Sequence, residues 1–332
     1  MAENIPNSNL SNPRISEEFR SLFTISFQFY TMAEKTSDLY NDPRNVNLVK
    51  KLIELYYRKV SPTYNKILER LKQKYIELES TVEKNDSIEE QIGIGYVYDY
   101  IKNFNVKKDP FNVFTNSIKI HQELYRECDK KLKDDYEQRY REVVELKERA
   151  IKEKSKELYS EYQEKYRNLP ESNTFGGKLR VKDVTAGAGI EVPPCHEAML
   201  FFNSFLNPEK VVEMQKVYKT YELFDYIDYC VNLSADLILY QPFQDGNKRT
   251  FRSLVNLMFK MRNIPPIFIK ENEREAYLNA LNKAVMYKDY KDLDQFYYFK
   301  ICDSIYEFDV ALMEEKQEKT PVESNLKRLY NS

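Results

Sequence analysis

The chain has 332 residues, and its 42% hydrophobic content is enough to build a core of ordinary size, which excludes a disordered protein. Lys and Arg nearly balance Asp and Glu, and the formal net charge of -2 argues against nucleic acid as the primary partner. With only 7 glycines and 31% charged residues, the composition favours helices over β-rich folds. We therefore expect an all-α fold.

The cysteines and the first residues bear on the cellular compartment. The four cysteines are scattered, with no Cys-x-x-Cys pair, which predicts free thiols in a reducing environment. Residues 1–18 are polar and lack an apolar segment behind a basic start, and no stretch approaches the roughly 18 apolar residues of a membrane span. We expect a cytoplasmic protein without a membrane span, and export by a system that reads no cleavable signal is left open. The cysteines are Cys128, Cys195, Cys230 and Cys302.

The N-terminal part divides into a polar end and a helical region. Residues 1–15 are rich in Asn, Ser and Pro and offer little apolar surface, so we expect them to be disordered. From Glu17 to Tyr75 apolar residues recur at three and four positions, which is typical of amphipathic helices. This pattern predicts an N-terminal helical region over 16–90.

A long Lys- and Glu-rich segment follows, from His121 to Tyr166. One narrow apolar stripe runs along it, which predicts a single long helix or a helical hairpin, inserted at about 126–170. Such an arm either packs on its own domain or forms a coiled coil with a partner, and its irregular heptads favour the first. The stripe consists of Tyr125, Cys128, Leu132, Tyr136, Tyr140, Val143, Leu146 and Ala150.

After a break at 168–177 that contains Pro, Ser, Asn and two glycines, the chain changes character. Two short β-prone runs between Lys178 and Val192 surround a glycine-containing turn, which predicts a β-hairpin. Helical patterns then resume, with at least four or five helices up to Met313. The polar residues 313–332 are expected to be a flexible tail.

The most informative stretch is Tyr240 to Phe259. Here Asp245, Gly246 and Asn247 form a tight turn that leads directly into an apolar helix. A helix that starts behind a glycine turn presents free backbone N–H groups and the positive end of its dipole, so it is suited to bind phosphate.

Charged side chains surround this turn. Arg249 and Arg252 are three residues apart, hence on one face of the helix, where two guanidinium groups can grip a polyphosphate. The carboxylate of Asp245 is a candidate ligand for the Mg²⁺ that accompanies a nucleotide. Without further information, an Asx turn that caps a helix with solvated arginines explains the same residues.

The stretch closely resembles the signature of the Fic (Fido) family, His-Pro-Phe-x-Asp/Glu-Gly-Asn-Gly-Arg-x-x-Arg. The resemblance continues downstream over 263–296 and upstream in 176–184, which is similar to the family's flap, and in 118–128, which is similar to its preceding helix. It covers roughly 90–125 and 173–305 and implies a Fic domain at 91–312, interrupted by the helical insertion. The matching positions are Pro242, Phe243, Asp245, Gly246, Asn247, Arg249 and Arg252.

The resemblance implies a helical Fic core with a β-hairpin flap, the cofactors ATP and Mg²⁺, and transfer of AMP to a Ser, Thr or Tyr hydroxyl of a target protein. The flap at about 178–192 would align that target by strand addition. By the same resemblance, Asp245 would bind Mg²⁺ and Phe243 would anchor the loop in the core. The phosphates would be held by Gly246, Asn247, Lys248, Arg249 and Arg252.

Two positions depart from the family pattern. Gln241 stands where the family has its catalytic histidine, and an amide cannot accept a proton near neutral pH, although a well-placed base is worth about 10²- to 10⁴-fold in rate. Lys248 replaces the second glycine, as in the Doc branch, whose members act as protein kinases. We therefore expect weak or altered adenylyltransferase activity. A pseudoenzyme that only binds partners, and a transferase with another reaction or donor, remain alternatives.

Three further residues were considered for roles near the site. His121 is expected to be a packed helix residue away from the chemistry, and His196 has a small chance of reaching the site. Fic proteins are often restrained by a helix with a Ser/Thr-x-x-x-Glu-Gly/Asn motif, whose glutamate pairs with the second arginine. The segment Glu79–Lys84 resembles it, with Glu83 as the regulatory carboxylate and Glu79 in the Ser/Thr position; an ordinary exposed glutamate is the alternative.

Overall fold

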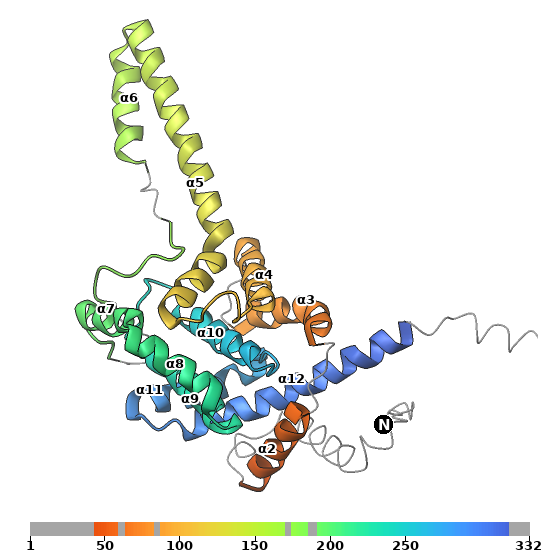
Figure 1. Cartoon of the computed structure of the whole chain (residues 1–332). Helices are drawn as coiled ribbons and strands as arrows, with labels where there is room; N and C mark the ends of the chain where they lie inside the picture. Colours follow the sequence, from red (N-terminus) through yellow and green to blue (C-terminus); the bar gives the residue numbers. More distant parts are fainter. Residues whose placement is uncertain (1–42, 59–63, 83–86, 170–173, 185–190, 319–332) are drawn as a thin grey trace, which may run out of the picture.

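The computed structural model describes residues 43–58, 64–82, 87–169, 174–184 and 191–318. Over these residues the chain is helical, as predicted (Figure 1). The last helix runs past Met313, where a flexible tail was predicted, and ends at Glu318. The helices are α2 (Pro43–Arg58), α3 (Tyr64–Val82), α4 (Ile88–Asn103), α5 (Val113–Glu153), α6 (Lys156–Arg167), α7 (Cys195–Asn203), α8 (Pro208–Thr220), α9 (Leu223–Tyr240), α10 (Asn247–Met261), α11 (Arg274–Tyr287) and α12 (Lys291–Glu318), with short 3₁₀ turns at Ser204–Leu206 and Glu271–Glu273.

Helix α10 lies at the centre of the core. A helix at the surface buries one stripe of side chains, whereas nearly every residue of α10 from Asn247 to Phe259 is buried. Helices α9, α5 and α4 pack around it, and α11 and α12 complete the core beyond α9. The helix that carries the predicted phosphate-binding turn is thereby held on most sides.

The N-terminal helices share this core. Helix α2 packs on α12, where the Cys302 thiol donates to the backbone oxygen of Val49 at 3.6 Å, and α3 packs on α4. The Arg274 Nε donates to the carbonyl of Val82 at 2.5 Å, which ties the end of α3 to the start of α11. Helices α2 and α3 therefore buttress the body of the molecule. None of the helices in the described segments has the length and apolar character needed to cross a membrane.

Helices α5 and α6 form a hairpin that projects from the body as a long arm (Figure 1). Helix α5 ends at Lys154 in a left-handed conformation, and Ser155 begins α6 by accepting a hydrogen bond from the N–H of Leu158. Val143, Leu146 and Ala150 are buried in this outer part of α5, where α6 packs against it. The outer end of the apolar stripe is thus used within the arm itself, whereas Leu132 and Tyr140 in its middle are exposed.

The segment predicted to form a hairpin flap contacts the motif loop. Leu179 makes an isolated antiparallel bridge with Phe243, and the N–H of Arg180 donates to the carbonyl of Pro242 at 2.9 Å. The described flap residues, 178–184 and 191–192, form no paired strands with each other. The turn of the predicted hairpin, 185–190, lies outside the described residues, so the hairpin stays a prediction.

Candidate active site

The motif forms a short loop between α9 and α10. Gln241 ends α9 in the left-handed region (φ 43°, ψ 63°), and its N–H donates to the carbonyl of Leu237 at 3.1 Å. Phe243 is fully buried and packs against the ring of Phe251. Gly246 then turns the chain at φ 71° into α10, a conformation that favours glycine.

Asn247 stabilises the loop itself. Its Oδ1 accepts from the backbone N–H of Phe243 at 3.0 Å, and its Nδ2 donates to the carbonyl of the same residue at 2.8 Å. Because both groups of the amide are used inside a buried loop, the side chain fixes the loop's shape instead of facing outward. The sequence predicted a phosphate contact for Asn247, whereas its side chain in the structure is committed to the backbone of Phe243.

The first turn of α10 has the geometry of an anion site. Gly246 caps the helix without a side-chain hydrogen bond, so no side chain serves as the N-cap acceptor for its leading amides. The exposed Asp245 accepts at Oδ1 from the N–H of Gly246 at 2.6 Å, and Lys248 is half-buried beside it. The predicted phosphate and metal residues of the turn are therefore brought together at one end of α10.

The two arginines that follow are buried and paired with carboxylates. Arg249, only 6% exposed, lies 3.4 Å from Glu90 of α4 and donates to the hydroxyl of Tyr125 at 3.2 Å. Burial alone would lower the pKa of the Arg249 guanidinium. The nearby Tyr125 and Glu90 outweigh this effect and raise the pKa, so Arg249 stays positively charged.

Arg252 is completely buried and donates from Nη2 to Oε2 of Glu79 at 2.8 Å. The predicted regulatory residue, Glu83, lies outside the described residues, and Glu79 had been placed at the Ser/Thr position of that motif. In the described part of the chain, Glu79 is the carboxylate that contacts the second arginine. The two pairs cover the guanidinium groups that were predicted to grip the outer phosphates.

His121 is packed, as predicted, but it is not remote from the loop. Its ring stacks on Phe243 with centroids 4.0 Å apart, and the N–H of Gly177 donates to Nδ1 at 2.9 Å. Because Nδ1 accepts, Nε2 carries the hydrogen and donates to the carbonyl of Asp245 at 2.9 Å. Burial lowers the pKa of His121 to about 4, so the ring is neutral at physiological pH. The ring supports the loop and does not serve as a free base.

His196 offers no substitute for the missing base in the described structure. Its side chain is 74% exposed at the start of α7, and its ion-pair partner is the neighbouring Glu197 at 3.9 Å. The half-buried Gln241 therefore lies where a catalytic base is expected. His121 cannot replace it, because both of its ring nitrogens already form hydrogen bonds, one to the loop and one to the flap.

Several residues that shape the site were not predicted from sequence. Arg180, 3% exposed, donates from Nη2 to the carbonyls of Pro193 at 2.7 Å and Tyr240 at 3.1 Å, which ties both flap ends to the end of α9. Glu90 and Tyr125 were likewise missed as partners of Arg249. Local sequence patterns carry no signal for such contacts, because the partners are far apart in the chain.

The carboxylate at the turn suits a magnesium ion that binds together with a nucleotide. Within the described residues, no group of three or more His, Cys, Asp or Glu side chains could hold a metal on its own. Asp245 supplies one exposed carboxylate at the tip of the turn, and Mg²⁺ usually takes one or two protein carboxylates together with phosphate oxygens and waters.

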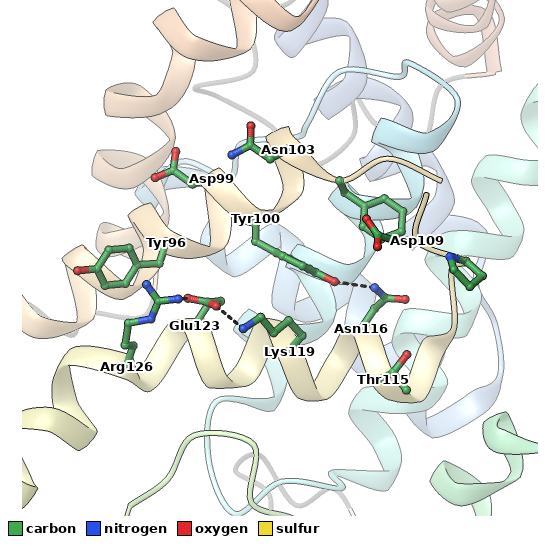
Figure 2. A pocket seen from close by; sticks show the side chains of 12 residues that line it. Tyr96, Asp99, Tyr100, Asn103, Asp109, Thr115, Asn116, Lys119, Glu123 and Arg126 are labelled. Carbon is green, nitrogen blue, oxygen red and sulfur yellow. Dashed lines mark hydrogen bonds and ion pairs between the residues drawn. The ribbon is translucent and has the colours of Figure 1, made fainter. Parts of the chain in front are cut away.

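A pocket of about 870 Å³ is lined by residues of α4, of α5 and of the segment that joins them. Figure 2 shows the side chains that line it. Its wall includes the buried Glu123, which pairs with Lys119 at 2.7 Å and with Arg126, and the hydroxyl of Tyr100, which accepts from Asn116 at 2.7 Å. None of the motif residues lines this pocket, so it is separate from the candidate active site.

The chain is similar to curated proteins named protein adenylyltransferase Fic. It is 29% identical to the one from Aedes aegypti over 111 residues, and 30% identical over the same length to those from Drosophila erecta and Drosophila ananassae. These matches cover 33% of this chain and only 20% of each relative, so the chain spans about a fifth of the length of the relatives it matches. The similarity supports a Fic-type domain in this chain.

A solved structure of Fic-1 from C. elegans aligns over 91% of this chain and 86% of its own, with a TM-score of 0.47 and 16% sequence identity. No family model matches the chain. At the level of the family, the named relatives support a Fic-like function.

Proposed function

We propose that this chain binds Mg·ATP at the N-terminus of α10 and transfers AMP to hydroxyl groups of a target protein, weakly, because Gln241 replaces the base. The observation that carries this proposal is the glycine-capped first turn of α10, which has no side-chain N-cap and stands beside two arginines on one helix face. The similarity to proteins named adenylyltransferases supports the choice of reaction.

In this reaction the acceptor hydroxyl oxygen forms a bond to the α-phosphorus of ATP. The bond between that phosphorus and the bridging oxygen breaks, pyrophosphate leaves, and the hydroxyl proton must go to a base. The amides of the α10 turn and Arg249 would bind the phosphates, and Asp245 would hold Mg²⁺, which supplies charge neutralisation. Gln241 lies at the end of α9, and its side-chain amide cannot take the proton, so water would have to accept it.

The acceptor would be a protein segment that pairs with the flap. Residues 178–184 lie beside the loop, where Leu179 already bridges to Phe243, so an extended target strand added there would bring its side chain to the loop.

The alternative from another class is a pseudoenzyme that binds partners without transfer. The pairing of both arginines with carboxylates favours it, since Glu79 and Glu90 occupy the groups that phosphates would use. A third reading keeps the transferase and changes the group transferred, because Lys248 resembles the Doc branch of protein kinases.

The test compares the full chain with its Gln241→His variant, each incubated with Mg²⁺, cell lysate and ATP labelled at the α- or the γ-phosphate. The proposal predicts strong labelling of proteins by the histidine variant with the α-label only. Gln244→His is the matched control, because it adds a histidine to an exposed position of the same loop. Labelling with the γ-label would indicate phosphorylation, and no labelling by any variant would favour the pseudoenzyme.

A further inference from the structure

Two side chains of α5 hold three successive backbone amides at the entrance of the flap. The N–H groups of Phe175 and Gly176 donate to Oδ1 and Oδ2 of Asp129 at 2.6 and 2.8 Å. The next N–H, of Gly177, donates to Nδ1 of His121 at 2.9 Å. A carboxylate that accepts two backbone N–H groups forms strong, charge-assisted bonds, so this segment is fixed in one register against α5.

The same helix also fixes the motif loop. His121 donates from its other ring nitrogen to the carbonyl of Asp245, and its ring stacks on Phe243. A single imidazole therefore joins the flap on one side to the loop on the other. Beyond this bridge the flap and the loop pair directly, through the contacts of Leu179 and Arg180 with the backbone of 242–243.

Two glycines allow the close approach of the flap entrance to α5. A Cβ on Gly176 would lie 2.7 Å from Oδ2 of Asp129, and a Cβ on Gly177 would lie 2.7 Å from the side chain of Gln122. Gly177 also has φ 75°, which non-glycine residues rarely adopt. The backbone of the flap thus lies directly on α5.

Asp129 lies eight residues, about two turns, after His121 on α5, just before the exposed stretch 130–135 of the helix. It is half-buried, unlike the exposed Asp135 further along the helix. Among the residues that the structure describes, its hydrogen bonds go to the backbone of Phe175 and Gly176 and not to the arginines or the first turn of α10. Its hydrogen bonds therefore bear on the position of the flap and not on the nucleotide residues.

We propose that Asp129 and His121 are positioning residues, which hold flap residues 175–180 against the motif loop so that an acceptor hydroxyl is presented to the bound nucleotide. This inference rests on the proposed function. It states that the contacts between α5 and the flap decide whether a protein hydroxyl or water attacks the nucleotide. When the flap is released, nucleotide still binds, and water replaces the protein hydroxyl as the attacking group.

The experiment uses Asp129→Asn in the full chain, with Asp135→Asn as the matched control on the same helix. An asparagine offers one acceptor oxygen and a donor group, so one of the two flap amides faces a donor and loses its bond. Amide hydrogen exchange of the peptide covering 174–180 is measured by mass spectrometry in both variants. We expect roughly tenfold faster exchange in Asp129→Asn and no change in Asp135→Asn, since a lost charged hydrogen bond is worth about a factor of ten.

The functional readout is the partition of α-labelled AMP between protein and water, measured with lysate proteins in the Gln241→His background. Asp129→Asn should lower the ratio of protein-bound to free AMP about tenfold, while the Kd for Mg·ATP stays within about twofold. Equal partition and equal exchange in the two aspartate variants would overturn the proposal, as would a loss of Mg·ATP affinity as large as the loss of labelling. If the Gln241→His chain yields neither labelled protein nor free AMP, the proposed reaction fails, and the exchange comparison alone decides whether Asp129 fixes the flap.

Discussion

The buried pair between Glu79 and Arg252 has opposite consequences for stability and for nucleotide binding. Arg252 is fully buried and Glu79 is 3% exposed, with 2.8 Å between Nη2 and Oε2. Breaking a buried ion pair by removing one partner typically costs about 3–5 kcal/mol, because the other charge is left uncompensated. Glutamine keeps one acceptor oxygen, so we expect a loss at the low end of this range. Glu79→Gln should lower the free energy of unfolding by about 3 kcal/mol.

Nucleotide should reverse this loss. Glu79→Gln removes one negative charge beside Arg252, and a phosphate group can supply a negative charge there. A ligand at 100 times its Kd stabilises the folded state by about 2.7 kcal/mol. We therefore expect Mg·ATP to bind the Glu79→Gln chain at least tenfold more tightly than the wild type, and to restore most of its stability.

Urea unfolding with and without Mg·ATP, together with calorimetric titration, measures both effects. Glu77→Gln is the control, because Glu77 is an exposed glutamate on the same helix, α3. The reasoning is refuted if Glu79→Gln unfolds at the same urea concentration as Glu77→Gln, or if it binds Mg·ATP no more tightly than the wild type.

Three further changes test the loop and its supports. His121→Gln should remove a loss of stability that the wild type shows in acid. Burial lowers the pKa of His121 from 6.5 to about 4, so between these pH values the unfolded chain binds more protons than the folded chain. The free energy of unfolding of the wild type therefore falls by up to about 3 kcal/mol as the pH is lowered through this range. Unfolding of both chains at several pH values measures the difference, and parallel pH profiles would contradict it. Asn247→Ala should cost about 2–4 kcal/mol in urea unfolding, because it leaves the buried N–H and C=O of Phe243 without their partner; a cost under about 0.5 kcal/mol would show that the loop does not need this amide. Gly246→Ala should lower the melting temperature, since its Cβ would lie 2.8 Å from the ring of Tyr125 at φ 71°, and an unchanged melting temperature would mean that the turn can relax.

The helical architecture could be predicted because it depends on local patterns. The apolar stripe that includes Val143, Leu146 and Ala150 predicted a long helix or a hairpin, and these residues are buried where α5 packs against α6. The turn at Asp245 and Gly246 was predicted from residue types that only such a turn favours, and the structure places it at the start of α10.

The partners of the site residues could not be predicted in the same way. Glu79 and Arg252 are 173 residues apart, and Glu90 and Arg249 are 159 apart, so no spacing rule connects them. The arginines were expected either to grip phosphates or to lie on a solvated helix face. Contacts with Glu79 of α3 and Glu90 of α4 hold them in the interior instead. His121 was predicted to be packed, but its contact with the loop depends on how α5 crosses α10.

The Asp-Gly-Asn turn is open to two interpretations from its sequence, a simple helix cap and a phosphate-binding turn. The structure uses Asn247 for local hydrogen bonds within the loop, which agrees with the simple turn. It also leaves the first turn of α10 without a side-chain cap, which agrees with an anion site. The two interpretations therefore describe different parts of one motif.

The central claim, that the N-terminus of α10 binds a nucleotide, is tested most directly by titrating the full chain with Mg·ATP and comparing it with Arg249→Ala. Arg139→Ala, an exposed arginine on the arm, is the control, and the melting temperature checks that each variant is folded. The account predicts saturable binding by the wild type and the control, with at least tenfold weaker binding by Arg249→Ala. Binding of equal strength in all three chains, or no binding by any of them, would contradict it.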